Sequence, residues 1–135
     1  MQIASTVVSS AARHEVTVRT DRTSQILSVA PKASGPGSSI SGGEFLMLAL
    51  ATCYCNDLYR EAARLGIAIQ GVEVEVSGEF LGVGLAATNI SYRANVHSSA
   101  APGDVQRLLR ETDAVAEVHN TIRSGVPVRL LQGDG

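Results

Sequence analysis

Two cysteines are the side chains in this 135-residue chain best suited to nucleophilic or redox chemistry. They stand two positions apart, at Cys53 and Cys55, within a segment that we expect to be helical. Residues two apart on a helix point about 200° away from each other, so an intact helix keeps these thiols from forming a disulfide and lets at most one face a given site. Free cysteine usually packs as a small apolar residue, and spacing alone favours that interpretation for both.

A reactive cysteine needs help to lose its proton, because the thiolate is the nucleophile. The helix dipole acts mainly in the first turn, and Cys53 lies about nine positions into the expected helix. Asp57 would oppose a thiolate if it lay close, and Arg60 is two turns further along the helix. We therefore expect an activating arginine to come from another segment, either Arg19 or Arg22.

The remaining candidate groups carry no recognised pattern. His14, His97 and His119 are scattered and have no second ligand at metal-binding spacing, so we expect each to be structural or solvated. The chain has no nucleophile elbow and no Walker or Rossmann glycine motif. The sequence thus predicts neither a cofactor nor a metal.

Composition excludes other classes of function. The net charge is -2 and Lys32 is the only lysine, which disfavours nucleic-acid binding and a polybasic membrane patch. The longest apolar run, Phe45 to Ala51, is far shorter than the roughly 20 residues that span a bilayer. With no signal peptide visible, we expect a cytoplasmic protein that forms a single domain over residues 1–135.

Periodicity predicts the elements that position the cysteines. Residues 14–19 and 25–29 alternate as two strands, and residues 33–39 have the composition of a loop. A helix over 44–65 has Ser41 as its N-cap and Gly66 as its stop. Because its first half is apolar all round, we expect this central helix to be buried on most sides.

The second half of the chain alternates again before it turns helical. Residues 67–80 and 88–97 predict an antiparallel strand pair, a helix begins at Pro102, and Asp113 is a candidate cap for a further helix that ends at Gly125. Residues 126–130 predict a last strand. The order ββ-α-ββ-αα-β indicates an α+β fold with antiparallel sheets around the central helix.

The run Ser41-Gly42-Gly43-Glu44-Phe45-Leu46-Met47-Leu48-Ala49-Leu50-Ala51-Thr52-Cys53 resembles the central-helix motif of the OsmC/Ohr family, the osmotically inducible and organic hydroperoxide resistance proteins. Residues 65–67, the valine-rich strand, and residues 116–122 and 125–128 continue the resemblance in the same order. It covers nearly the whole chain, and the series of motifs is more specific than any one of them.

The resemblance implies an intertwined, obligate homodimer with a site at the subunit interface. Active members reduce small organic hydroperoxides with a cysteine pair, and a dithiol restores the resulting disulfide. Cys53 occupies the position of the attacking cysteine, while Ala116 stands where the second cysteine is expected. The site glutamate corresponds to Gly43, with Glu44 one position late, and the site arginine to Arg19 or Arg22.

These departures leave two main hypotheses, beside chemistry of another kind at the same pocket, which the sequence neither supports nor excludes. In the first, the protein is a one-cysteine thiol peroxidase with Cys53, Glu44 and Arg19 as site residues and an external thiol as reductant, since Cys55 could reach Cys53 only if the helix opened locally. In the second, a pocket at the dimer interface binds a small apolar ligand without chemistry. Retention of Cys53 at the end of the apolar helix run favours the peroxidase.

Overall fold

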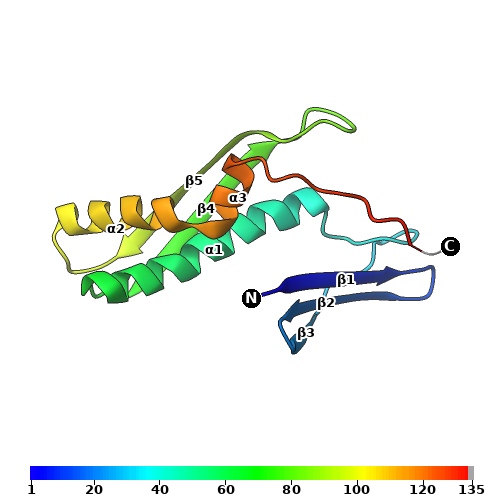
Figure 1. Cartoon of the computed structure of the whole chain (residues 1–135), viewed down its shortest axis with the longest axis horizontal. Coiled ribbons are helices and arrows are strands. Elements are labelled where there is room, and N and C mark those ends of the chain that lie inside the picture. Colours follow the sequence, from blue (N-terminus) through cyan, green and yellow to red (C-terminus); the bar gives the residue numbers. More distant parts are fainter. Residues whose placement is uncertain (134–135) are drawn as a thin grey trace. The chain divides into compact units, whose positions relative to one another are not determined.

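The computed structural model describes residues 1–133, which form three helices, a three-stranded sheet and a two-stranded sheet (Figure 1). The chain divides into two compact units, Met1–Phe45 and Leu46–Gly135. The first unit consists mainly of strands, and the second contains the helices and one strand pair. This segregation confirms the α+β class. No helix within residues 1–133 combines the length and the apolar character needed to cross a membrane.

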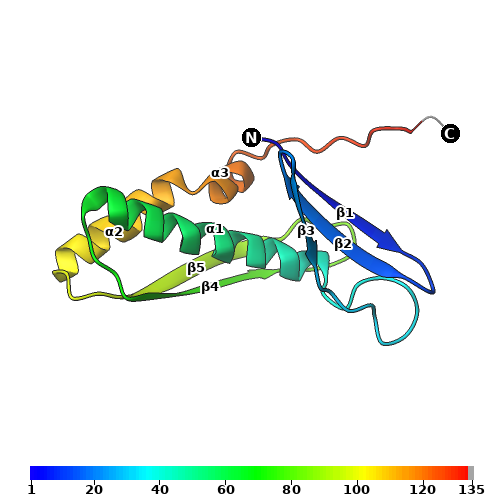
Figure 2. The ribbon, with the colours of Figure 1, turned by 90° about the horizontal axis from the view of Figure 1, so that it is seen from below.

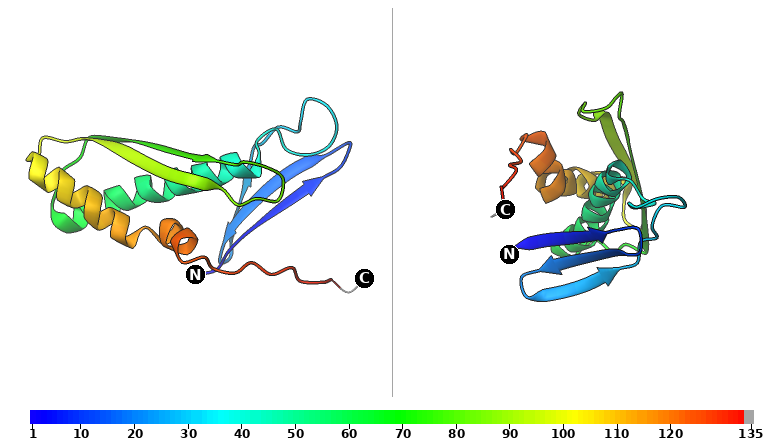
Figure 3. Two further views of the ribbon diagram at one scale, coloured as in Figure 1. Left: turned by 90° about the horizontal axis from the view of Figure 1, so that it is seen from above. Right: turned by 90° about the vertical axis from the view of Figure 1, so that its right-hand side faces the viewer.

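The first unit is built on an antiparallel meander. Strands β1 (Ile3–Ser9), β2 (His14–Thr20) and β3 (Thr23–Leu27) pair in chain order, as the right-hand view of Figure 3 shows. In the turn between β2 and β3, Asp21 takes a φ of 50°. The prediction of only two strands in this segment is wrong, because β1 pairs along the whole of β2 as a third strand.

The central helix is α1 (Gly42–Leu65), and both of its predicted ends are confirmed. The hydroxyl of Ser41 accepts a hydrogen bond of 3.1 Å from the backbone N–H of Glu44 and caps the first turn. At the other end Gly66 takes a φ of 68°, and the N–H of Ile67 donates to the carbonyl of Ala62 at 2.9 Å. This left-handed glycine with its reversed hydrogen bond is a Schellman ending.

Strands β4 (Gly71–Glu79) and β5 (Thr88–His97) form the second sheet, and α1 and α2 (Pro102–Val115) lie along one face of it (Figure 2). The alternation predicted from the sequence is confirmed. Val72 and Val74 of β4 and the inward-facing residues of β5 pack on the core, whereas Glu75 and Arg93 form an ion pair of 3.2 Å on the other face. The core itself consists of Tyr54, Leu58, Ala62, Leu108 and Ala116.

Two predictions about the end of the chain are wrong. The last helix, α3 (Glu117–Arg123), begins after a break at Ala116, and Asp113 lies in the final turn of α2 instead of capping α3. Residues 126–133 form no strand. Inside residues 1–133 no strand pairs with this segment, so its alternating apolar side chains have no sheet to pack on. Val126 and Val128 are accordingly 55% and 97% exposed.

The expectation that α1 is buried on most sides is also wrong for the single chain. Leu50, Tyr54 and Leu58 are buried on one face, but Leu48 is 54% exposed and Tyr59 48%. Only one face of the helix is therefore covered by the rest of the chain, although its first half is apolar on all sides. Part of the apolar surface of α1 remains exposed.

Candidate functional site

Cys53 lies in the middle of α1, half-buried, with two carboxylates beside its sulfur. Its Sγ is 3.7 Å from Oδ2 of Asp57 and 3.8 Å from Oε2 of Glu117, at the start of α3. Asp57 follows Cys53 by one helical turn, so it shares the same face of α1. The break at Ala116 places the first residue of α3 against that face.

Arg60 holds the two carboxylates together. Its Nη1 lies 3.0 Å from Oδ1 of Asp57 and 3.3 Å from Oε1 of Glu117. Asp57 is buried and Arg60 is half-exposed, so the guanidinium closes the cluster on its solvent side. Although Arg60 is two turns from Cys53 in the sequence, it reaches the cluster through these carboxylates.

Cys53 rests as a neutral thiol in this environment. Burial raises the pKa of the Cys53 thiol, and the negative charges of Asp57 and Glu117 raise it further, against a hydrogen bond from the backbone of Val118. The prediction that Asp57 opposes the thiolate is therefore confirmed. Burial and the nearby Glu117 also raise the pKa of Asp57, which makes this carboxyl a better proton acceptor than an exposed one.

The ligand atoms of Cys53, Asp57 and Glu117 all lie within 4.8 Å of one another. A thiolate and two carboxylates at this spacing could hold a divalent cation. Arg60 already binds both carboxylates, so a metal would have to displace it. The donor set fits proton transfer better than metal binding.

The other predicted site residues lie elsewhere. Arg19 is in β2, exposed and paired across the sheet with Ala4 and Ser24, and Glu44 is in the first turn of α1, where it accepts a hydrogen bond of 3.3 Å from Ser41. Both belong to the first compact unit and Cys53 to the second.

Neither Cys55 nor Ala116 supplies a second thiol beside Cys53. Cys55 is half-buried and lines a shallow depression of about 260 Å³ with Thr52, Asn56 and neighbours, of which Cys53 is not one. The two thiols thus face different surroundings, as their spacing on a helix predicts. Ala116 is fully buried in the core against which Cys53 packs.

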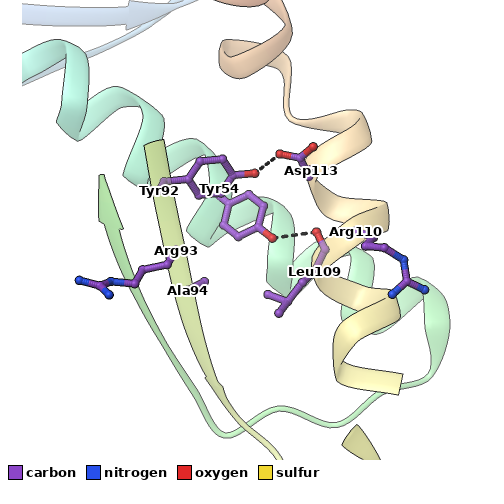
Figure 4. A pocket seen from close by; sticks show the side chains of 7 residues that line it. All are labelled: Tyr54, Tyr92, Arg93, Ala94, Leu109, Arg110 and Asp113. Carbon is purple, nitrogen blue, oxygen red and sulfur yellow. Dashed lines mark hydrogen bonds between the residues drawn. The ribbon is translucent and has the colours of Figure 1, made fainter. Parts of the chain in front are cut away.

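A separate groove of about 440 Å³ lies between β5 and α2 (Figure 4). The hydroxyl of Tyr54 donates to the carbonyl of Leu109 at 2.8 Å and the hydroxyl of Tyr92 donates to Asp113, so both tyrosines are tied to α2. Burial raises the pKa of Tyr54 to about 12. Arg93 and Arg110 point away from the two tyrosines (Figure 4), and Cys53 does not line the groove.

Sequence reasoning missed Glu117 altogether. It is 64 positions from Cys53, and a single exposed glutamate in a helical stretch carries no signal of its own. The sequence predicts that His119 is structural or solvated, and the structure shows it 3% exposed beside the rings of Tyr54 and Tyr92.

Several solved structures share this arrangement of elements. An OsmC-like protein from Mycoplasma pneumoniae superposes with a TM-score of 0.69 at 19% identity, over 93% of this chain and 89% of its own. An organic hydroperoxide resistance protein from Elizabethkingia anophelis gives 0.62 at 14% identity, over 93% and 90%. One from Legionella pneumophila gives 0.59 at 13% identity, over 91% and 90%. At these identities the likeness establishes the fold.

The family follows from the sequence itself. The family model described as OsmC-like protein matches residues 35–131, which include α1 and all elements after it. The chain therefore belongs to the OsmC-like family. No curated protein matches its sequence.

Proposed function

We propose that this protein is a thiol-dependent peroxidase that reduces small organic hydroperoxides with Cys53 as its single reacting cysteine. The observation that carries the proposal is the Cys53 thiol with Asp57 and Glu117 at 3.7 and 3.8 Å, both held by Arg60. Membership of the OsmC-like family and the hydroperoxide resistance proteins among its structural relatives supply the substrate class.

Because the resting thiol of Cys53 is protonated, it needs a base, and the neighbouring carboxylates can accept its proton. As the sulfur attacks the terminal oxygen of the hydroperoxide, the S–O bond forms and the O–O bond breaks. The thiol proton passes to Asp57 and on to the departing alkoxide, so that the products are a sulfenic acid on Cys53 and an alcohol. The distance and the raised pKa of Asp57 suit this transfer.

An external thiol would complete the cycle. It attacks the sulfenic sulfur and releases water, and a second thiol displaces Cys53 from the mixed disulfide, which regenerates the free thiol. The buried residue at the position of the family's second cysteine is Ala116, which has no thiol, and this supports the one-cysteine route. Arg19 and Glu44 remain our proposed additional site residues.

The charge of Asp57 offers a direct test of the proposed site. In a Cys55→Ser background, Asp57→Asn should lower the pKa of Cys53, because a negative charge that disfavours the thiolate is removed. The rate of Cys53 alkylation by iodoacetamide would then rise at lower pH than in the parent. Asp104→Asn removes the same charge in α2 and should leave the profile unchanged. An unmoved or upward-shifted profile in Asp57→Asn would contradict the assignment.

A non-catalytic binding role is the second candidate, and the raised pKa of Cys53 favours it. A protein of this kind would consume no hydroperoxide and would retain an apolar ligand through purification. Mass spectrometry of the native protein and an assay of hydroperoxide consumption separate the two roles.

We further propose that the protein is a homodimer and that residues 1–135 act as one domain within it. The first sheet buries only Val16, too little to be stable alone. Across residues 1–133 the seven buried apolar residues are outnumbered by nineteen exposed large ones, including Leu48 on α1 and Val128 near the end of the chain. Apolar side chains that a single chain leaves exposed are available to pack against a second copy.

Leu48→Glu should convert the dimer into monomers, because it places a charge on the uncovered face of α1. Sedimentation velocity at micromolar concentration measures the change. Gln106→Glu introduces the same charge on an exposed position of α2 and should remain dimeric. A wild-type protein that sediments as a monomer would refute the proposed dimer.

A further inference from the structure

His119 is the most unusual buried group in the second compact unit. It lies in α3 with 3% of its surface exposed, and neither Nδ1 nor Nε2 has a hydrogen-bond partner within residues 1–133. Its ring stands near the rings of Tyr92 and Tyr54, with centroids at 4.6 and 5.8 Å. A buried polar group left without a partner costs about 1 to 3 kcal/mol, so this side chain calls for one.

The imidazole is neutral in this position. Burial lowers the pKa of His119 and the nearby Arg123 lowers it further, against the opposing charge of Asp113. A neutral imidazole offers one N–H donor and one lone-pair acceptor. It therefore suits a hydroxyl group, which can both donate and accept, better than an anion.

A cavity of about 120 Å³ adjoins this ring. Leu50, Ile90 and Ile122 line it with hydrocarbon, and Tyr92 and Arg123 complete the wall. Both of these polar neighbours are already engaged: Tyr92 donates to Asp113, and Arg123 donates to Asp113 at 2.7 Å. His119 is thus the one polar group of the wall that lacks a partner in the described residues.

The wall also limits what can fill the cavity. His119 offers a water two partners, but Leu50, Ile90 and Ile122 offer none, so a water alone would leave most of the hydrocarbon wall without contact. The volume is somewhat below the roughly 150 Å³ of apolar cavities that accept benzene. A compact molecule of a few carbons with one polar group matches both the size and the lining.

We propose that this cavity is a binding site for a small, branched or cyclic alcohol-type molecule, whose hydroxyl forms a hydrogen bond with His119 while its hydrocarbon packs on Leu50, Ile90 and Ile122. Cys53 does not line the cavity, so the site is separate from the thiol cluster. The inference stands whether or not Cys53 reduces hydroperoxides.

Titration of the full chain with tert-butanol, followed by NMR, tests the site. The His119 ring signals and the methyl signals of Ile90 and Ile122 should shift together and saturate at millimolar concentrations, the weak affinity expected of so small a ligand. The methyls of Ile69, which pack on the core away from the cavity wall, should not move. Shifts that rise linearly without saturation, or that are equal at Ile69, would overturn the proposal.

Two variants separate the polar anchor from the space. His119→Met keeps a side chain of similar size but removes the ring donor and acceptor, and should weaken binding by about three- to tenfold, the worth of one neutral hydrogen bond. Ile90→Phe should fill the cavity and abolish the saturable shift. Undiminished binding in His119→Met overturns the assignment even if Ile90→Phe fails to fold.

Discussion

Replacement of Cys53 by serine is expected to reduce hydroperoxide consumption by more than about a hundredfold, because the hydroxyl is a far weaker nucleophile toward oxygen and no other thiol lies in the carboxylate cluster within residues 1–133. The assay follows loss of tert-butyl hydroperoxide in the presence of excess dithiothreitol. Serine is close to cysteine in size, so the half-buried position should tolerate it.

Cys55→Ser is the matched control, since it makes the same change two residues along α1. Cys55 lines a different depression from the Cys53 cluster, and this variant should retain most of the activity. Residual activity of Cys53→Ser near the wild-type level, or a parallel loss in Cys55→Ser, would contradict a one-cysteine mechanism centred on Cys53.

Leu58→Ala should have the largest effect on stability, with a loss of about 3 kcal/mol in the free energy of unfolding. Leu58 is 0% exposed and lies at the centre of the core with Tyr54, Ala62 and Leu108. Truncation of a fully buried leucine forfeits its transfer free energy and leaves a cavity, which together cost about 2 to 5 kcal/mol. Urea denaturation at matched protein concentration measures the difference.

Leu81→Ala deletes the same atoms at a position that is 69% exposed. Its effect should stay within about 0.5 kcal/mol, as is usual for surface substitutions. If the two variants lost equal stability, burial in the single chain would not describe the native packing, and the core assigned to Tyr54, Leu58 and Leu108 would have to be revised.

The helices and the second strand pair could be predicted because their signals are local. A cap at Ser41 and a left-handed glycine at Gly66 depend on residues within one turn of the helix end. Likewise, alternation along β4 and β5 directly encodes which side chains face the core. The strand predicted over residues 126–130 failed for the opposite reason, since a strand exists only where another strand supplies its hydrogen bonds.

The candidate site was only half predictable. Cys53 was recognisable from the central-helix motif and Asp57 from its position one turn later. Glu117 and the bridging role of Arg60 were not, because they depend on how α3 turns against α1 after the break at Ala116. The partnerless state of His119 was equally invisible, since burial and unmet hydrogen bonds belong to the packed molecule.

By itself, the sequence determined the class of fold, the ends of the central helix, and the separation of Cys53 and Cys55 onto different faces, because each follows from backbone geometry over a few residues. Only the tertiary structure decided the surroundings of the thiol. Burial and the carboxylates of Asp57 and Glu117 raise the pKa of Cys53, and both the burial and the approach of Glu117, 64 positions away, are set by packing between helices, which no local pattern records.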